Sequence, residues 1–147
     1  MARLVAGGVT LRNQINKRWP KRDKASDGWI GDKAHQARGN ASDHNPDSRG
    51  LVHALDIDKD LDPKDPDAAQ RLANQIVAYA ASGLPGSNRI KYVVYAGKLA
   101  SGSYPTSMWT WRKGNWGHYQ HIHVSFTTKG ENNAQTFPLP ILNTPKK

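Results

Sequence analysis

The segment HYQHIHVSF, residues 118–126, decides the fold. Apolar and polar residues alternate along it, which is the pattern of a strand with one buried face. The core-facing positions are Ile122, Val124 and Phe126. The other face carries His121, His123 and Ser125, so the strand would present two imidazoles to a cleft.

Two further strands are predicted upstream of this segment. Residues 89–96 have a β-branched and aromatic centre, and residues 51–57 form a second apolar run. Alternation along this run places Asp56 and Asp58 on the same side. A carboxylate in a buried stretch is costly unless it is paired or binds a cation. Asp56 therefore needs a partner.

Two helices are predicted between and before these strands. Apolar residues at four-residue spacing favour a short helix over residues 10–19, capped by Thr10. A second helix is expected to start at residues 65–67 and to end at Gly83.

The order of these elements favours an α+β fold. We expect one domain over residues 1–147, with helices packed on a small, mainly antiparallel sheet. Its core would span about residues 9–127, a hairpin would occupy residues 108–116, and residues 128–147 would form an extended, partly loose tail. Residues 58–62 would form a solvated turn.

Composition narrows the classes of function. The 147 residues include no cysteine, which excludes disulfides, a thiolate nucleophile and cysteine-ligated zinc. The formal net charge of +9 favours a polyanionic partner, either nucleic acid or the anionic polymers of a bacterial wall. The basic run over residues 17–24 is expected to be a solvated surface.

The sequence carries no evident membrane or export signal. No apolar run approaches the ~20 residues of a spanning helix, and the amino-terminal segment lacks a secretory signal. We therefore expect no membrane partner, and we expect the protein to leave the cytoplasm, if at all, by another route. A monomer is also expected.

All six histidines fall in two short windows, which is the strongest feature of the sequence. They are His35, His44 and His53 in the first window, and His118, His121 and His123 in the second. A zinc ion shared by His44, Asp56 and a histidine of the second window would give the buried carboxylate its partner. Three such ligands leave one position open for water, and Asp58 is the alternative carboxylate.

These residues resemble a known group of zinc peptidases. Ser42-Asp43-His44, then Gly50, Ala54-Leu55-Asp56 and finally His121-Ile122-His123 are similar to the motifs of the zinc D-alanyl-D-alanine carboxypeptidases and L-alanyl-D-glutamate endopeptidases. The wider group includes murein endopeptidases, lysostaphin-like enzymes and the hedgehog domain. Within it, residues 27–58 look most like small endolysins of phages that infect actinobacteria.

The resemblance implies a hedgehog/DD-peptidase-like fold and a ligand set. His44, Asp56 and His123 match the three zinc ligands, one ion per chain, in a cleft on the sheet. Arg38 matches an arginine that faces the substrate carbonyl, and Ser42 would support the site by a hydrogen bond.

One departure from the carboxypeptidase pattern concerns the general base. The acidic base of those enzymes lies three residues before the last ligand, where this chain has Gln120, and an amide cannot accept the proton. The murein and lysostaphin-like enzymes instead have a histidine that matches His121, and the murein enzymes have another that matches His118. We therefore expect His121 to act as the base and His118 to stabilise the transition state.

The expected function is hydrolysis of amide bonds in peptidoglycan peptides after release to the cell wall. Trp116 and Tyr119 would contact the peptide, and anionic wall polymers would be further partners, rather than nucleic acid. A His-Asn-His nuclease is the alternative enzyme, because Asp43-His44-Asn45-Pro46 is similar to its first strand. The non-enzymatic alternative is a wall-binding module that keeps zinc only as structure.

Overall fold

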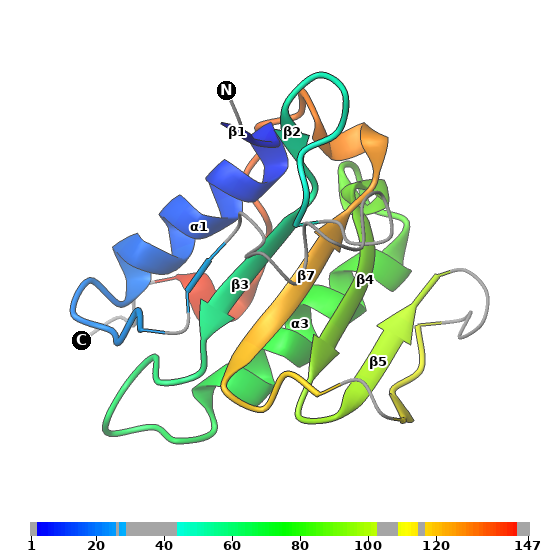
Figure 1. Cartoon of the computed structure of the whole chain (residues 1–147). Helices are drawn as coiled ribbons and strands as arrows, with labels where there is room; N and C mark the ends of the chain where they lie inside the picture. The colour runs from blue at the N-terminus through cyan, green and yellow to red at the C-terminus, as the bar shows by residue number, and fades with distance from the viewer. Residues whose placement is uncertain (1–2, 26, 29–43, 103–108, 115–116, 144–147) are drawn as a thin grey trace.

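A five-stranded sheet lies at the centre of the fold, and Figure 1 shows how its strands are arranged. The computed structural model describes residues 3–25, 27–28, 44–102, 109–114 and 117–143. In the order β3-β7-β4-β5-β6, the strands are β3 (Ala54–Asp58), β7 (His121–Phe126), β4 (Ile90–Tyr95), β5 (Lys98–Ser101) and β6 (Arg112–Lys113). Every pair in this sheet is antiparallel. The small α+β protein with a mainly antiparallel sheet is therefore confirmed.

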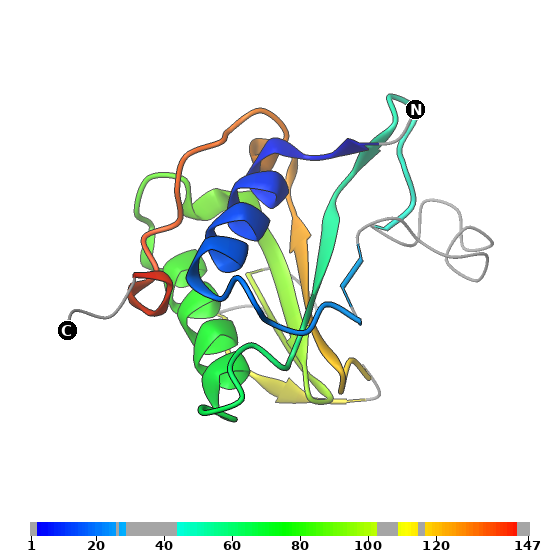
Figure 2. The same ribbon diagram turned by 90° about the vertical axis from the view of Figure 1, so that its left-hand side faces the viewer.

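Two α-helices of the described chain cover one face of the sheet (Figure 2). Helix α1 (Ala6–Arg18) packs near β3, and α3 (Ala68–Ser82) packs near β4. Their buried stripes join Ile122, Val124 and Phe126 of β7 in one core, as predicted. Gly83 ends α3 in the left-handed conformation, also as predicted. Neither described helix has the length and hydropathy needed to cross a membrane.

Helix α1 begins earlier than the sequence pattern predicts. Thr10 lies inside the helix, where its hydroxyl donates to the Ala134 carbonyl at 2.9 Å, and it is not the cap. The first turn contains Gly7 and Gly8, both buried. A Cβ on Gly8 would lie 2.8 Å from Cγ of Leu4, so glycine is needed for the Leu4 side chain to pack here. Because glycine has a poor helix propensity, the sequence pattern did not place it in a helix.

The predicted strand over residues 51–57 is broken at His53. Its first part, β2 (Leu51–Val52), pairs in parallel with β1 (Arg3–Leu4), whereas β3 pairs with β7. One apolar run thus serves two sheets.

The turn of the hairpin predicted over residues 108–116 lies outside the described residues, and the strand before it pairs with an element that the sequence did not indicate. Arg112 and Lys113 pair instead with Leu99 and Lys98 of β5. Strands β4 and β5 are joined by the two-residue turn Ala96-Gly97, whose φ angles of 52° and 77° suit a tight hairpin. Alanine is uncommon in the left-handed conformation, so Ala96 did not indicate a turn, and strand β5 was not predicted from the sequence.

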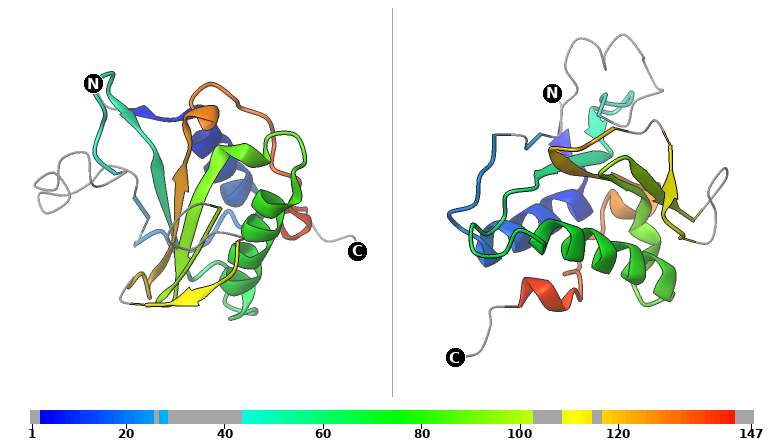
Figure 3. Two further views of the ribbon diagram at one scale, coloured as in Figure 1. Left: turned by 90° about the vertical axis from the view of Figure 1, so that its right-hand side faces the viewer. Right: turned by 90° about the horizontal axis from the view of Figure 1, so that it is seen from below.

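The carboxy-terminal segment is not loose over its described part. Phe137 and Leu139 are buried in the core, and η4 (Pro140–Leu142) lies against both helices (Figure 3). The guanidinium of Arg89, which is fully buried, donates to the carbonyls of Asn133 and Gln135. Local sequence patterns do not reveal contacts between residues far apart in the chain, so the bonds from Arg89 to this segment were not predicted.

The basic run over residues 17–24 is not wholly solvated. The buried Arg22 guanidinium pairs with the Asp27 carboxylate and also donates to Asn16. Asp27 in turn accepts from the backbone N–H of Asp58 at 2.7 Å, and Gly28 pairs with Asp56 along the outer edge of β3. Arg22 therefore helps to fix the strand that carries Asp56.

Candidate metal centre

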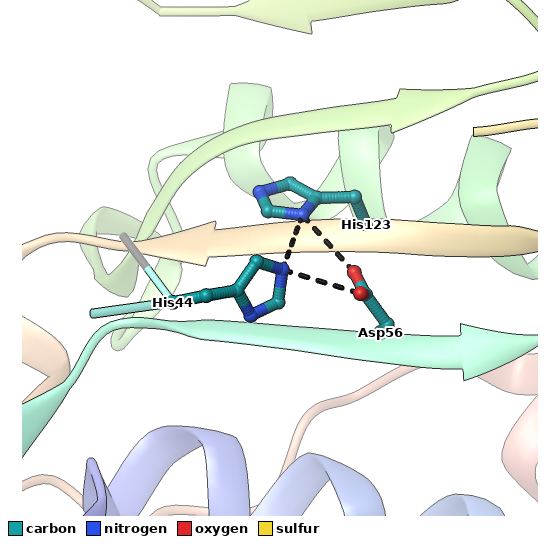
Figure 4. Close-up of side chains that lie close together, drawn as sticks. All are labelled: His44, Asp56 and His123. Carbon is teal, nitrogen blue, oxygen red and sulfur yellow. Dashed lines mark hydrogen bonds and ion pairs between the residues drawn. The ribbon is translucent and has the colours of Figure 1, made fainter. Parts of the chain in front are cut away.

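Three side chains from distant parts of the chain meet on the face of the sheet opposite the helices (Figure 4). Asp56 lies on β3 directly opposite His123 on β7, and His44 approaches from the loop before β2. Nε2 of His44 is 3.1 Å from Nδ1 of His123 and 3.2 Å from Oδ2 of Asp56. Nδ1 of His123 is 3.1 Å from Oδ1 of Asp56. The three groups could hold a metal ion.

The spacing of these atoms matches a tetrahedral metal site. Two ligand atoms that each lie about 2.05 Å from a tetrahedral zinc ion are about 3.3 Å apart. The observed separations of 3.1–3.2 Å are close to that value, with His44 measured to Oδ2 and His123 to Oδ1 of the Asp56 carboxylate. Hydrogen bonds alone fit less well, because an imidazole N–H aimed at Asp56 cannot also serve the contact between the two ring nitrogens.

Asp56 is ionised in this setting. Burial raises its pKa, but the hydrogen bonds from His123 and His44 outweigh burial and hold the pKa well below its usual range. The triangle thus combines one carboxylate charge with two imidazoles, a donor set that suits a divalent cation.

A buried hydroxyl orients the His123 ring. Its Nε2 is 2.7 Å from Oγ of Ser125, a residue with no exposed surface. The Tyr92 ring stacks on the imidazole at 5.4 Å between centroids and 18° between planes. Because the hydroxyl engages Nε2, Nδ1 is the nitrogen left to face the metal position. Sequence alternation placed Ser125 on this face but did not indicate this role.

Two more imidazoles adjoin the triangle. Nδ1 of His118 is 2.8 Å from Nε2 of His121, which in turn is 3.4 Å from Oδ2 of Asp56. Burial, followed by the charges of His123 and His121, lowers the pKa of His118 to about 4, so this ring is neutral at neutral pH. His118, His121 and Asp56 form a second group that could hold a metal, and it shares its carboxylate with the first.

The backbone at His118 is held in a left-handed conformation, with φ of 60°. Two hydrogen bonds fix it there, from Ala96 N–H to the His118 carbonyl and from Gly97 N–H to the Gly117 carbonyl, both at 2.9 Å. A positive φ at a residue other than glycine is costly and often marks a functional position. The β4–β5 turn thus sets the position of His118.

Asp58 does not join the histidine triangle. Its Oδ1 accepts from the backbone N–H of Asp60, and its carboxylate groups with Asp23 and Asp60. With 2% of its surface exposed, Asp58 is buried rather than part of a solvated turn. Of the two carboxylates that the sequence offered, Asp56 is the one near His44 and His123.

The loop between His44 and β2 is held by a separate charged cluster. Asp47 accepts from the backbone N–H groups of Arg49 and Leu51 at 2.8 and 3.0 Å. The Arg49 guanidinium forms two bonds to the Glu131 carboxylate, which is also 2.7 Å from Nε2 of His53. Asp47, His53 and Glu131 could hold a metal, but the guanidinium of Arg49 already supplies a cation there. Glu131 was not predicted, since nothing in its local sequence marks it.

The remaining predicted site residues are less informative. Tyr119 is 63% exposed and lies over Gly97, and Gln120 is also exposed. Arg38, Ser42, Trp116 and His35 lie outside the described residues.

Comparisons with protein-family models, with curated proteins and with solved structures found no match to this chain.

Proposed function

We propose that the protein is a zinc-dependent peptidase that hydrolyses amide bonds in peptidoglycan peptides. The observation that carries the proposal is the triangle of Nε2 of His44, Nδ1 of His123 and the Asp56 carboxylate, with sides of 3.1–3.2 Å. The sequence resemblance to the zinc carboxypeptidases and endopeptidases selects the same three residues.

Zinc is the metal that this donor set suits best. Two imidazoles and one carboxylate are a frequent zinc set, whereas Mg²⁺ and Ca²⁺ favour oxygen ligands. Three protein ligands leave a fourth position for water or substrate, as in catalytic zinc sites. A mainly antiparallel sheet with helices on one face supports the proposal of a hedgehog/DD-peptidase-like fold, and the ligand side chains of Figure 4 would lie on its other face.

The residues beside the triangle have complementary roles in hydrolysis. Zinc, when bound, supplies Lewis-acid activation of a water molecule and of the scissile carbonyl. His121 is assigned as the general base that takes up the proton of the attacking water and passes it to the leaving amine. Nε2 of His121 is 2.8 Å from Nδ1 of His118, so this contact has to open before Nε2 can accept a proton.

The peptide substrate is proposed to cross the face of the sheet that carries the triangle. The exposed ring of Tyr119 borders His118 and His121 in sequence and offers a contact for the peptide, together with Trp116. Arg38 faces the carbonyl oxygen and Ser42 supports the ligand loop in this proposal.

A zinc site without catalysis is the second candidate, and one observation favours it. His121 lies 3.4 Å from Asp56, so its imidazole is near enough to become a fourth protein ligand. Four protein ligands would close the site and exclude water, as in structural zinc sites.

Digestion of purified peptidoglycan separates these functions. We expect the zinc-loaded protein to release peptide fragments whose masses identify the bond cut, and we expect a chelator to stop the release. Intact peptidoglycan with full zinc content would support the closed site. Nicking of plasmid DNA with intact peptidoglycan would support the nuclease.

A further inference from the structure

Net positive charge is concentrated in one stretch of the chain, residues 68–130, because this stretch has basic residues but no acidic ones. Residues 68–130 contain no aspartate or glutamate. The same stretch has seven basic residues, namely Arg71, Arg89, Lys91, Lys98, Arg112, Lys113 and Lys129. It supplies α3 and the strands β4, β5, β6 and β7. The acidic residues of the described chain therefore lie outside this stretch, around β3 and the loops beside it.

Three of these cations gather at the free edge of the sheet. Lys98 on β5 and Lys113 on β6 lie directly opposite each other, and Arg112 is next to Lys113. All three are exposed, and none has an ion-pair partner among the described residues. Like charges directly opposite each other destabilise an antiparallel pair unless an anion lies between them. We call Lys98, Arg112 and Lys113 the cationic edge.

Arg112 belongs to the face of the sheet that carries the candidate metal centre. The pairs Asp56–His123, His123–Val94, Val94–Leu99 and Leu99–Arg112 form one continuous row across all five strands. Residues directly opposite in a sheet share a face. The neighbour of Arg112 supports this, because Trp111 donates from Nε1 to Asn74 of α3, which covers the other face.

The row also gives the scale of the arrangement. Strands β7 and β6 are three strand spacings apart, which is about 14 Å at ~4.8 Å per spacing. Lys98 and Lys113 point to the other face of the same edge, so the charge wraps around β5 and β6.

We propose that the cationic edge binds the phosphate-rich anionic polymer of the bacterial wall and so holds the wall beside the metal centre. Repeating negative charges match three cations that are spaced along two short strands and have no ion-pair partner within the described part of the chain. The choice of a wall polymer over nucleic acid rests on the proposed function. Among the described residues, Tyr119 is the only aromatic side chain that is largely exposed. One exposed ring offers little surface on which nucleic-acid bases could stack.

The test compares two triple variants with the same change in charge. Lys98→Gln/Arg112→Gln/Lys113→Gln removes the cationic edge. Lys17→Gln/Lys21→Gln/Lys24→Gln removes three exposed lysines near the end of α1, which packs by the opposite edge strand β3. The protein as purified is sedimented at 4 °C with intact walls and with walls stripped of their phosphodiester-linked polymers, and soluble fragments are measured in the same tubes.

We expect the edge variant to bind intact walls about tenfold more weakly at ~50 mM salt, with a shallower salt dependence. The control variant should remain within about twofold of the original protein, and stripped walls should bind all three proteins equally weakly. Equal weakening of the two variants, or unchanged binding to stripped walls, would overturn the proposal. Tighter binding to a DNA duplex that only the edge variant loses would also overturn it, in favour of nucleic acid.

The two proposals fail separately in this experiment. Walls bound through the cationic edge but never cut would contradict the peptidase and leave the polymer surface standing. If the edge variant binds and cuts walls as well as the original protein does, the cationic edge is contradicted and the peptidase proposal stands.

Discussion

Asp56 and His123 lie directly opposite each other on adjacent antiparallel strands, with Oδ1 and Nδ1 3.1 Å apart. Direct opposition on β3 and β7 fixes both side chains on one face of the sheet, so their separation depends on the most regular part of the fold. Only His44 comes from a loop. Strand pairing therefore positions two of the three candidate ligands, Asp56 and His123, before any metal binds.

The carboxylate charge of Asp56 is expected to dominate metal affinity. Asp56→Asn keeps the shape but removes the charge, and zinc affinity should fall at least about 100-fold, beyond the range of outer-shell changes. Asp58→Asn is the matched control, because Asp58 is a buried carboxylate on the same strand outside the triangle. Zinc titration with a competing chelator measures both. Equal losses would remove Asp56 from the ligand set.

His121 and His123 are expected to separate catalysis from metal binding. His123→Ala should lose zinc and activity together. His121→Ala should keep zinc but lose about 10²–10⁴ in turnover, the usual contribution of a general base. Metal analysis and peptidoglycan digestion on the same samples provide the comparison. A His121→Ala protein with unchanged rates would exclude His121 as the base.

Ser125 is expected to act through the His123 ring. Ser125→Ala removes the hydroxyl at Nε2 and should lower zinc affinity about 10–100-fold, as outer-shell changes commonly do. Ser101→Ala is the control, since Ser101 is also a buried serine directly opposite Tyr92, on β5 instead of β7, and its hydroxyl donates to the Lys91 carbonyl. If both serine variants bind zinc like the original protein, the hydroxyl does not orient the ligand.

Much of the candidate site could be predicted from sequence because its residues follow strand periodicity. The alternation over residues 121–126 placed His121 and His123 on one face, and the apolar run around Asp56 marked it as a carboxylate in need of a partner. His44 was indicated only by the resemblance and by histidine clustering. Periodicity cannot say where a loop residue will lie.

Several of the errors come from contacts between residues far apart in the chain. Arg89 is a basic residue in polar surroundings, yet it is buried because the carbonyls of Asn133 and Gln135 accept from its guanidinium. The same applies to Glu131, which binds Arg49 and His53 about 80 positions upstream. No local pattern encodes these partners.

The stability of the metal-free protein should fall in mild acid because of His118. The pKa of His118 is about 4 in the fold, below the ~6.5 of an unfolded chain. Between these values the unfolded chain binds a proton that the folded protein does not, so stability decreases as pH falls from ~6.5 to ~4. His118→Asn tolerates the positive φ and lacks the titration. Its melting temperature in chelator should therefore fall less over this range, whereas parallel curves would contradict the assignment.

Arg89 is expected to hold the carboxy-terminal segment on the core. Its guanidinium donates to the carbonyls of Gly86, Asn133 and Gln135 and lies 3.8 Å from the centroid of the Phe137 ring. Arg89→Met should lower the free energy of unfolding by about 2–4 kcal/mol, because it leaves several buried carbonyls without a donor. Arg71→Met, which removes an exposed guanidinium from α3, should cost no more than about 0.5–1 kcal/mol. Urea unfolding gives both values. Since the triangle lies on the opposite face of the sheet, zinc affinity should be unchanged in Arg89→Met, and a parallel loss of zinc would mean that this segment also supports the metal centre.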